Sequence, residues 1–171
     1  MTENRKPETE NPSPKAAPPE PETPPKKSLP PIWVLSTYFA EGFPYSLVRQ
    51  LSTVFFKDHG ASLEAIGMTS LYGVPWILKL LWAPLADAYS TKRRWILAAE
   101  FSLLAAALSM ALGSALPHPL QIVAALFVVA AFFSATHDIA IDGFYLEALD
   151  KKRQATFVGY QAMAFRIAMI L

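Results

Sequence analysis

Two aspartates, Asp138 and Asp142, stand four residues apart in an otherwise apolar stretch of this 171-residue sequence. On an α-helix this spacing places them one turn apart and on nearly the same face. Ionisable groups inside a membrane cost about 2.5–3.5 kcal/mol each on insertion scales, so they are expected to face a cavity or a partner. Close carboxylates resist joint ionisation, which suits groups that take up and release protons. The alternative is a structural salt bridge to Arg49, Lys79 or Arg166, and both roles can hold in different states.

A second row of polar residues precedes the aspartates and recurs at spacings of three and four. Its members are Tyr38, Glu41, Tyr45, Arg49 and Thr53. The spacing predicts one polar stripe on an otherwise apolar helix, and such a stripe lines a wet site. Pro44 lies within the stripe and removes a backbone donor, so a kink is predicted there.

Further polar residues extend these rows. Ser134, His137 and Tyr145 are predicted to share the face of the two aspartates. Lys79 has the alternative of extending its ammonium toward the lipid headgroups. Glu100 is expected at the membrane interface or paired with a loop cation, in a helix that is otherwise rich in alanine and predicted to be peripheral.

The elements that must carry these side chains are long apolar runs. A helix needs about 20 residues to cross the hydrocarbon core of a membrane. Five segments qualify or begin to, and they cover residues 32–56, 63–88, 95–116, 120–146 and 155–171. The fifth is short and ends on an apolar residue, so the sequence is expected to be truncated within it. The fold class predicted is therefore an all-α membrane protein with about five transmembrane helices.

Lysine and arginine clusters predict the orientation of these helices. Three basic clusters, at residues 26–27, 92–94 and 151–153, alternate with loops that hold Lys57 alone or no lysine or arginine. Because basic loops are retained in the cytoplasm, the N terminus is predicted to be cytoplasmic and the protein to be a multi-pass protein of the inner membrane.

The first 31 residues have a different composition from the rest. Ten of the 15 prolines lie there, and no aromatic residue does. This composition predicts a disordered cytoplasmic tail. The net charge of +1 gives no argument for nucleic acid, and the absence of cysteine excludes disulfides and thiolate metal sites.

The connection between the second and third predicted helices has a recognisable pattern. Residues 83–87 read APLAD and are followed by the basic run KRR at 92–94. This resembles the loop motif of the major facilitator superfamily, with candidate residues Ala83, Pro84, Asp87, Arg93 and Arg94. The match departs from the family pattern at Ala83, where the family has glycine, and at the step after Asp87.

Three blocks on three predicted helices carry a more specific resemblance. They read FAEGFP at 39–44, KLLWAPLAD at 79–87 and ATHDIAIDG at 135–143. Together they resemble the AmpG-type permeases of the major facilitator superfamily, a family related to acetyl-CoA transporters. The resemblance begins near residue 32 and leaves the tail unexplained.

The resemblance implies a twelve-helix, two-bundle carrier that works by alternating access and imports cell-wall muropeptides, driven by the proton gradient. Without the resemblance, the residues predict only a membrane protein that forms a cavity, most simply a carrier. The residues that would line or gate the path are Glu41, Arg49, Lys79, His137, Asp138, Asp142 and Arg166. Asp138 and Glu41 are the protonation candidates, and Arg49 and Arg166 would contact an anion or a peptide carboxylate.

The partners expected are a small-molecule solute, protons and the lipid bilayer, with no cofactor, no metal and no nucleic acid. Transport is expected to need a C-terminal half that this sequence lacks. Two alternatives remain open. One is an intramembrane prenyltransferase that uses Asp138 and Asp142 to hold Mg²⁺ and a diphosphate. The other is a membrane sensor that keeps the carrier fold without transport.

Overall fold

A computed structural model describes residues 32–171, and every regular element in that part of the chain is helical. The elements are α1 (Ile32–Ser46), a π-helical turn (Leu47–Leu51), α2 (Ser52–Asp58), α3 (Leu63–Met68), a 3-10 turn (Thr69–Gly73), α4 (Val74–Leu78), a 3-10 turn (Lys79–Leu81), α5 (Ala83–Ala88), α6 (Lys92–Gly113), α7 (Pro119–Ala148) and α8 (Lys151–Ile170). The all-α fold class is therefore confirmed. The tail predicted to be disordered lies outside the described residues.

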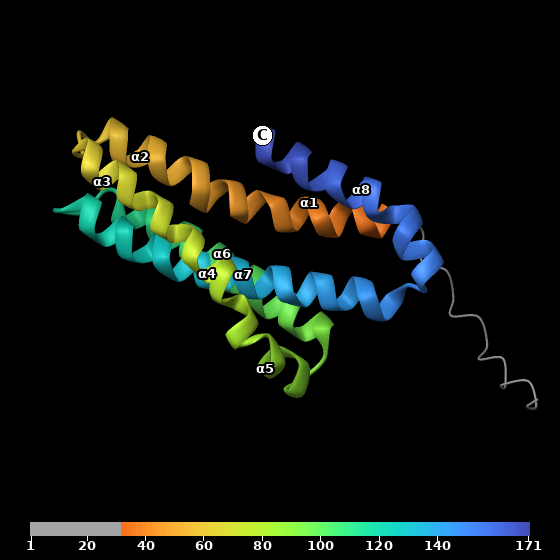
Figure 1. The fold of residues 1–171 in the computed structure, drawn as a ribbon. Helices are drawn as coiled ribbons and strands as arrows, with labels where there is room; N and C mark the ends of the chain where they lie inside the picture. The colour runs from red at the N-terminus through yellow and green to blue at the C-terminus, as the bar shows by residue number, and fades with distance from the viewer. Residues whose placement is uncertain (1–31) are drawn as a thin grey trace, which may run out of the picture.

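These elements form five helical stretches separated by short turns (Figure 1). Among the described residues, two helices are long and apolar enough to cross a membrane by length and composition, namely α6 and α7. The stretch over 32–58 is interrupted by the π-helical turn, and the stretch over 63–88 by two 3-10 turns. That all five stretches cross the membrane stays a prediction.

Helix α7 is the central element of the fold. It packs most extensively against α6 and also against α1, while α1 packs along α8 (Figure 1). One core cluster joins Val48 to Phe127 between the π-helical turn and α7. A second joins Val34 of α1 to Ile141 of α7 near the other end. The face of α1 that carries the predicted site is therefore held between α7 and α8.

The approach of α1 to α8 depends on a glycine. A Cβ on Gly42 would lie 2.7 Å from the carbonyl oxygen of Phe165 and 2.9 Å from the Cβ of Ala168. Small residues at helix crossings permit this kind of backbone contact in membrane proteins. Gly42 thus sets the spacing of α1 and α8 one residue away from Glu41.

The backbone of the first helical stretch changes at Pro44. Proline has no N–H to donate to the carbonyl of the preceding turn, and such breaks are commonly absorbed by wider turns. Here Pro44 remains inside α1 and the π-helical turn begins three residues later, at Leu47. The extra residue in that turn changes the direction in which all later side chains of the stretch point.

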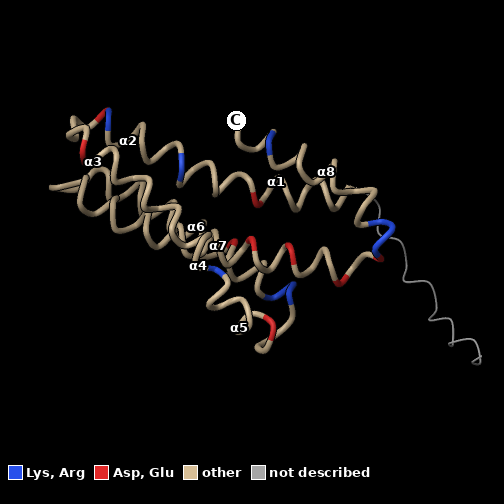
Figure 2. The backbone as a smooth tube through the Cα atoms, viewed as in Figure 1, with Lys and Arg blue, Asp and Glu red and all other residues tan. Residues whose placement is uncertain are grey.

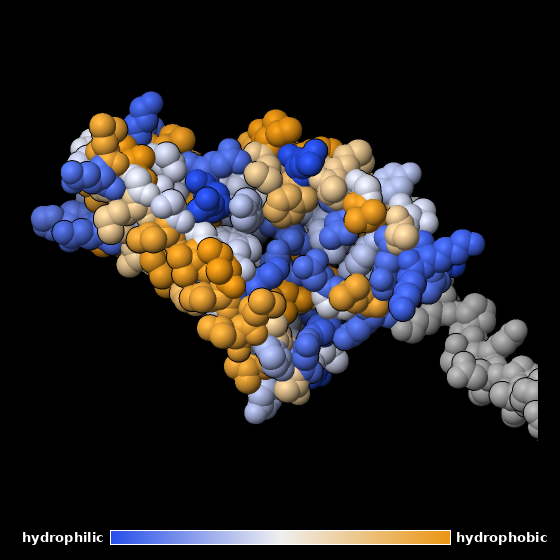
Figure 3. Space-filling view, in the orientation of Figure 1, coloured by the Kyte–Doolittle hydropathy of each residue, from blue (hydrophilic) through white to orange (hydrophobic). Residues whose placement is uncertain are grey.

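Apolar side chains cover much of the outer surface. Figure 3 shows them gathered over the segment that contains α3, α4 and α5. The exposed members there include Leu71, Ile77, Leu80 and Leu81. Charged positions in Figure 2 lie mostly near helix ends, and the acidic positions of α7 lie in the half that leads to α8. This distribution fits a lipid-facing surface with most charges near the helix ends and the others, such as Arg49 and Glu100, in contacts inside the bundle.

Candidate functional site

The centre of the candidate site is an ion-paired lysine on the second helical stretch. Lys79 Nζ pairs with the carboxylate of Asp138 and lies 3.9 Å from Oδ2 of Asp142. Lys79 begins the 3-10 turn that follows α4, and Trp82, next after this turn, donates its indole N–H to the Thr136 hydroxyl over 3.2 Å. The break in the helix therefore holds Lys79 against α7 at the level of both aspartates.

Two residues of α1 complete this charged cluster. The Tyr38 hydroxyl donates a hydrogen bond of 3.0 Å to Oδ1 of Asp142. The Glu41 carboxyl interacts electrostatically with Asp138, Asp142 and Lys79, and only 6% of the residue is exposed. One of its oxygens, Oε2, has no hydrogen-bond partner. Three helical stretches thus converge on one cluster, in which Glu41 is buried while Lys79, Asp138 and Asp142 are partly exposed.

The charges of the cluster do not balance. Three carboxyl groups, on Glu41, Asp138 and Asp142, surround the single ammonium of Lys79. Because isolated buried charge is costly, full ionisation of all three carboxyls is unfavourable. The arrangement can therefore hold a proton on a carboxyl group, and Glu41 has the fewest compensating contacts.

A cavity with both apolar and polar lining residues adjoins the cluster between α1 and α8. It has a volume of about 240 Å³, and its polar lining residues are Tyr38, Glu41, Gln161 and Arg166. Among the described residues, Arg166 has no ion-pair partner. A guanidinium facing a cavity is suited to bind a carboxylate or phosphate.

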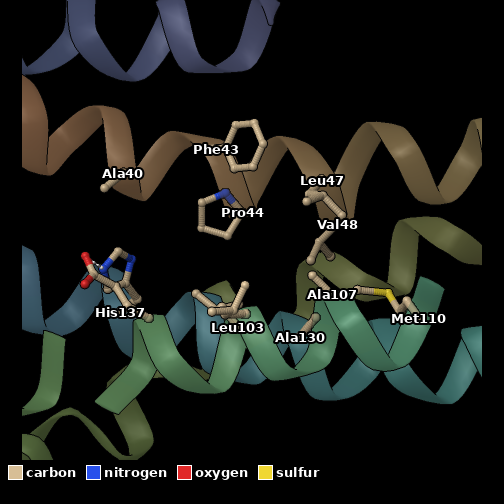
Figure 4. Close-up of a pocket in the computed structure, with 12 residues that line it drawn as sticks. Ala40, Phe43, Pro44, Leu47, Val48, Leu103, Ala107, Met110, Ala130 and His137 are labelled. Atoms are coloured by element: carbon tan, nitrogen blue, oxygen red, sulfur yellow. Dashed lines mark ion pairs between the residues drawn. The ribbon is translucent and has the colours of Figure 1, made fainter. Parts of the chain in front are cut away.

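His137 lies apart from this cluster, although it directly precedes Asp138. It is 1% exposed, and its Nε2 lies 3.6 Å from Oε1 of Glu100 on α6, which is too long for a hydrogen bond. Both ring nitrogens lack a hydrogen-bond partner. His137 lines a separate cavity of about 240 Å³, and Figure 4 shows it at the opposite end of the lining residues from Met110. Glu100 was predicted to lie at the membrane interface or to pair with a loop cation; it lies beside His137 and lines a cavity with Arg93, and the prediction stays open.

Residues predicted to share one polar face of a helix contact different neighbours in the structure. Consecutive helical residues differ by about 100°, so Asp138 turns to Lys79 and His137 turns to α6. On the first stretch, the π-helical turn redirects Arg49, whose Nη1 donates to the Ser70 carbonyl over 2.9 Å. Of the three bases considered as partners for the aspartates, Lys79 makes the ion pair, and Arg49 is used elsewhere.

The residues of the loop motif lie around α5 and the start of α6. Ala83 and Pro84 form the first turn of α5, where proline is tolerated. Asp87 pairs with Lys92, whereas Arg93 and Arg94 were the basic residues predicted for the motif. Both arginines are exposed, and Arg93 lines a third cavity of about 630 Å³ with Trp33, Phe144 and Glu100.

The geometry weakens the metal-dependent alternative. The Lys79 ammonium pairs with Asp138 and lies 3.9 Å from Oδ2 of Asp142, so the two carboxylates that would hold Mg²⁺ already face a cation. In residues 32–171, no group of three or more histidine, aspartate or glutamate side chains is arranged to hold a metal.

Mostly apolar helices around a charged cluster are typical of helical membrane proteins. The model of the Major Facilitator Superfamily matches residues 2–171, and the chain belongs to this family. No solved structure matches the chain significantly.

Individual proteins similar to this chain include AmpG-type permeases. The anhydromuropeptide permease of Escherichia coli K12 is 32% identical over 139 residues, which cover 78% of this chain and 28% of that protein. An uncharacterized protein of Haemophilus influenzae is 33% identical over 140 residues, covering 79% of this chain and 33% of that protein. The chain therefore resembles an AmpG-type permease and spans about a third of the length of these relatives.

Proposed function

We propose that this chain supplies part of the solute and proton pathway of an AmpG-type carrier that imports a muropeptide or a related solute by proton symport. The N terminus and the basic turns would lie on the cytoplasmic side of the inner membrane, with all five helical stretches crossing it. The observation that carries the proposal is the partly buried cluster in which three carboxyls face one lysine.

The coupling step follows from the charges. With one carboxyl protonated, the cluster holds two carboxylates and the Lys79 ammonium, which leaves a single excess negative charge. Loss of that proton adds a second excess charge in a poorly solvated position and favours rearrangement of α1 relative to α7. We assign the exchangeable proton to Glu41 and Asp138, which approach each other from these two helices.

The solute contact is assigned to the cavity between α1 and α8. Arg166 would bind a carboxylate of the solute, and Gln161 can donate and accept hydrogen bonds with amide or hydroxyl groups. Because Glu41 lines the same cavity, solute binding and protonation would take place at one site.

The test is uptake by a transport-competent protein that contains this chain, with Asp138→Asn and Glu41→Gln compared with the unaltered protein across pH. Loss of the dependence of uptake on the pH gradient is expected for both variants. Normal uptake with unchanged pH dependence in Asp138→Asn would refute the assignment of the proton site.

The 171 residues alone are proposed not to transport, because alternating access requires two bundles that move about a central site. Uptake by this chain alone in proteoliposomes would contradict that statement.

A further inference from the structure

Three aromatic side chains meet beside the candidate site, one from each of three helical stretches. The ring centroid of Tyr45 on α1 lies 4.9 Å from that of Trp76 on α4, and the two rings are inclined at 81°. On its other side Tyr45 lies 5.5 Å from the ring centroid of Phe165 on α8, at 51°. These are favourable arrangements for aromatic pairs. Tyr45, Trp76 and Phe165 therefore form an aromatic layer that bridges the three stretches.

The aromatic layer lies about one helical turn from the charged cluster. Tyr45 follows Glu41 by four residues on α1, a spacing that places both on one face of the helix. Trp76 precedes Lys79 by three residues, because its stretch runs in the opposite direction to α1 (Figure 1). The layer is thus displaced from the cluster toward the same end of the bundle in both stretches, namely the end where α2 and α3 meet.

The aromatic layer also adjoins the cavity to which the solute contact is assigned. Phe165 lines this cavity together with Glu41, Gln161 and Arg166. All three rings of the layer are only partly buried, so part of their surface is left uncovered by the packing of the helices. A solute whose carboxylate is bound at Arg166 therefore has aromatic rings within reach of its uncharged part.

The chemistry of the aromatic layer favours one kind of solute group. The face of an aromatic ring is negative and attracts C–H groups, which are what the face of a pyranose ring presents. The hydroxyl groups of such a sugar lie around its edge, where the Tyr45 hydroxyl and the Gln161 amide are able to donate and accept hydrogen bonds. A sugar ring therefore matches both the apolar and the polar groups found here.

We propose, resting on the function proposed above, that the aromatic layer is the sugar subsite of the carrier. A pyranose ring of the solute stacks on Trp76, the largest ring of the layer, and receives a hydrogen bond from the Tyr45 hydroxyl. The peptide part of the same solute places its carboxylate at Arg166. The two parts of a sugar–peptide conjugate are thus recognised by different residues, and each part should compete for uptake through its own contacts.

The test is inhibition of muropeptide uptake by each part of the solute, in a transport-competent protein that contains this chain. One inhibitor is the sugar portion without the peptide, and the other is the peptide portion without the sugar. Trp76→Leu should weaken inhibition by the sugar portion about tenfold, because the stacked face is lost, and should change inhibition by the peptide portion by less than about twofold. Arg166→Gln should show the reverse pattern.

Three further variants separate binding from packing. Trp76→Phe keeps an aromatic face and should restore inhibition by the sugar portion to within about threefold of the unaltered protein. Tyr45→Phe keeps the ring contacts and removes only the hydroxyl, so it decides the question if Trp76→Leu does not fold; it should weaken inhibition by the sugar portion about fivefold. Trp95→Leu, the same substitution in the first turn of α6, is the matched control and should affect neither inhibitor.

Failure of this inference differs from failure of the proposed function. If the unaltered protein takes up muropeptide but Trp76→Leu and Tyr45→Phe leave inhibition by the sugar portion unchanged, or weaken both inhibitors equally, the aromatic layer only packs helices together and the proposed function stands. If the unaltered protein takes up no muropeptide, the proposed function fails and the sugar subsite fails with it. Selective loss of inhibition by the sugar portion supports the subsite.

Discussion

Replacing Lys79 with methionine removes the cation of the partly buried cluster formed by Glu41, Lys79, Asp138 and Asp142, and the structure indicates how large the effect should be. Breaking a buried pair by removing one partner costs about 3–5 kcal/mol, whereas exposed pairs contribute about 0–1 kcal/mol. The side chains of Lys79 and Asp138 are 27% and 13% exposed, so the pair lies between these limits. We expect a loss of about 2 kcal/mol, which for a chain of this size lowers the unfolding midpoint by about 4–8 °C.

Glu41→Gln, in contrast, should not destabilise the fold. It removes the carboxyl with the fewest contacts and leaves the pair between Lys79 and Asp138 in place. The midpoint should stay unchanged or rise, because an amide of nearly the same shape replaces the carboxyl and the cluster can no longer gain a second excess negative charge. The matched control for Lys79→Met is Lys57→Met, the same substitution at an exposed lysine. It should change the free energy of unfolding by less than about 0.5 kcal/mol.

The assay is thermal unfolding of all variants in detergent micelles at neutral pH, followed by circular dichroism. If Glu41→Gln destabilises the protein as much as Lys79→Met, the cluster does not carry excess negative charge. If Lys79→Met behaves like Lys57→Met, the ion pair contributes nothing to the fold, and the reasoning about charge balance fails with it.

Three further predictions concern the helices around the cluster. Gly42→Ala should lower the unfolding midpoint by up to about 8 °C, because the added methyl meets α8 backbone, while Gly159→Ala should raise it; equal effects would contradict the close approach. Tyr38→Phe should cost about 1–2 kcal/mol in unfolding free energy by removing the hydrogen bond to Asp142, and an effect within measurement error would show that this bond is absent. Arg49→Met should loosen the 3-10 turn that it contacts, measured as faster amide exchange at residues 69–73, with uptake pH dependence unchanged; a change in that pH dependence would place the arginine in the proton path.

Much of the fold could be predicted from the sequence because its determinants are local. Apolar runs of membrane-spanning length, basic clusters in alternate turns and polar residues at spacings of three and four depend only on neighbouring residues. The three family blocks likewise placed Glu41, Lys79 and Asp138 on three different helices. All-helical structure and membership of the family followed from these features, and both are confirmed.

The tertiary structure decided which of these residues meet. A helical repeat gives the face of a residue but not the neighbour on that face, so it could not choose between Lys79, Arg49 and Arg166 as the partner of the aspartates. The π-helical turn after Pro44 and the 3-10 turn at Lys79 shift the phase of their helices, which moves Arg49 away and brings Lys79 in. The spacing of polar residues in the sequence does not predict such changes in helix phase.

Two contacts show most clearly that the sequence pattern does not predict which residues are neighbours in space. His137 and Asp138 are adjacent in the sequence but belong to different sites, because successive helical side chains diverge by about 100° and different helices cover each face. Lys92 pairs locally with Asp87, yet its stem lies against Gly143, some fifty residues away. The sequence by itself determined the helices and the charges they carry, and only their packing decided which charges are neighbours, since that depends on contacts between residues distant in the chain.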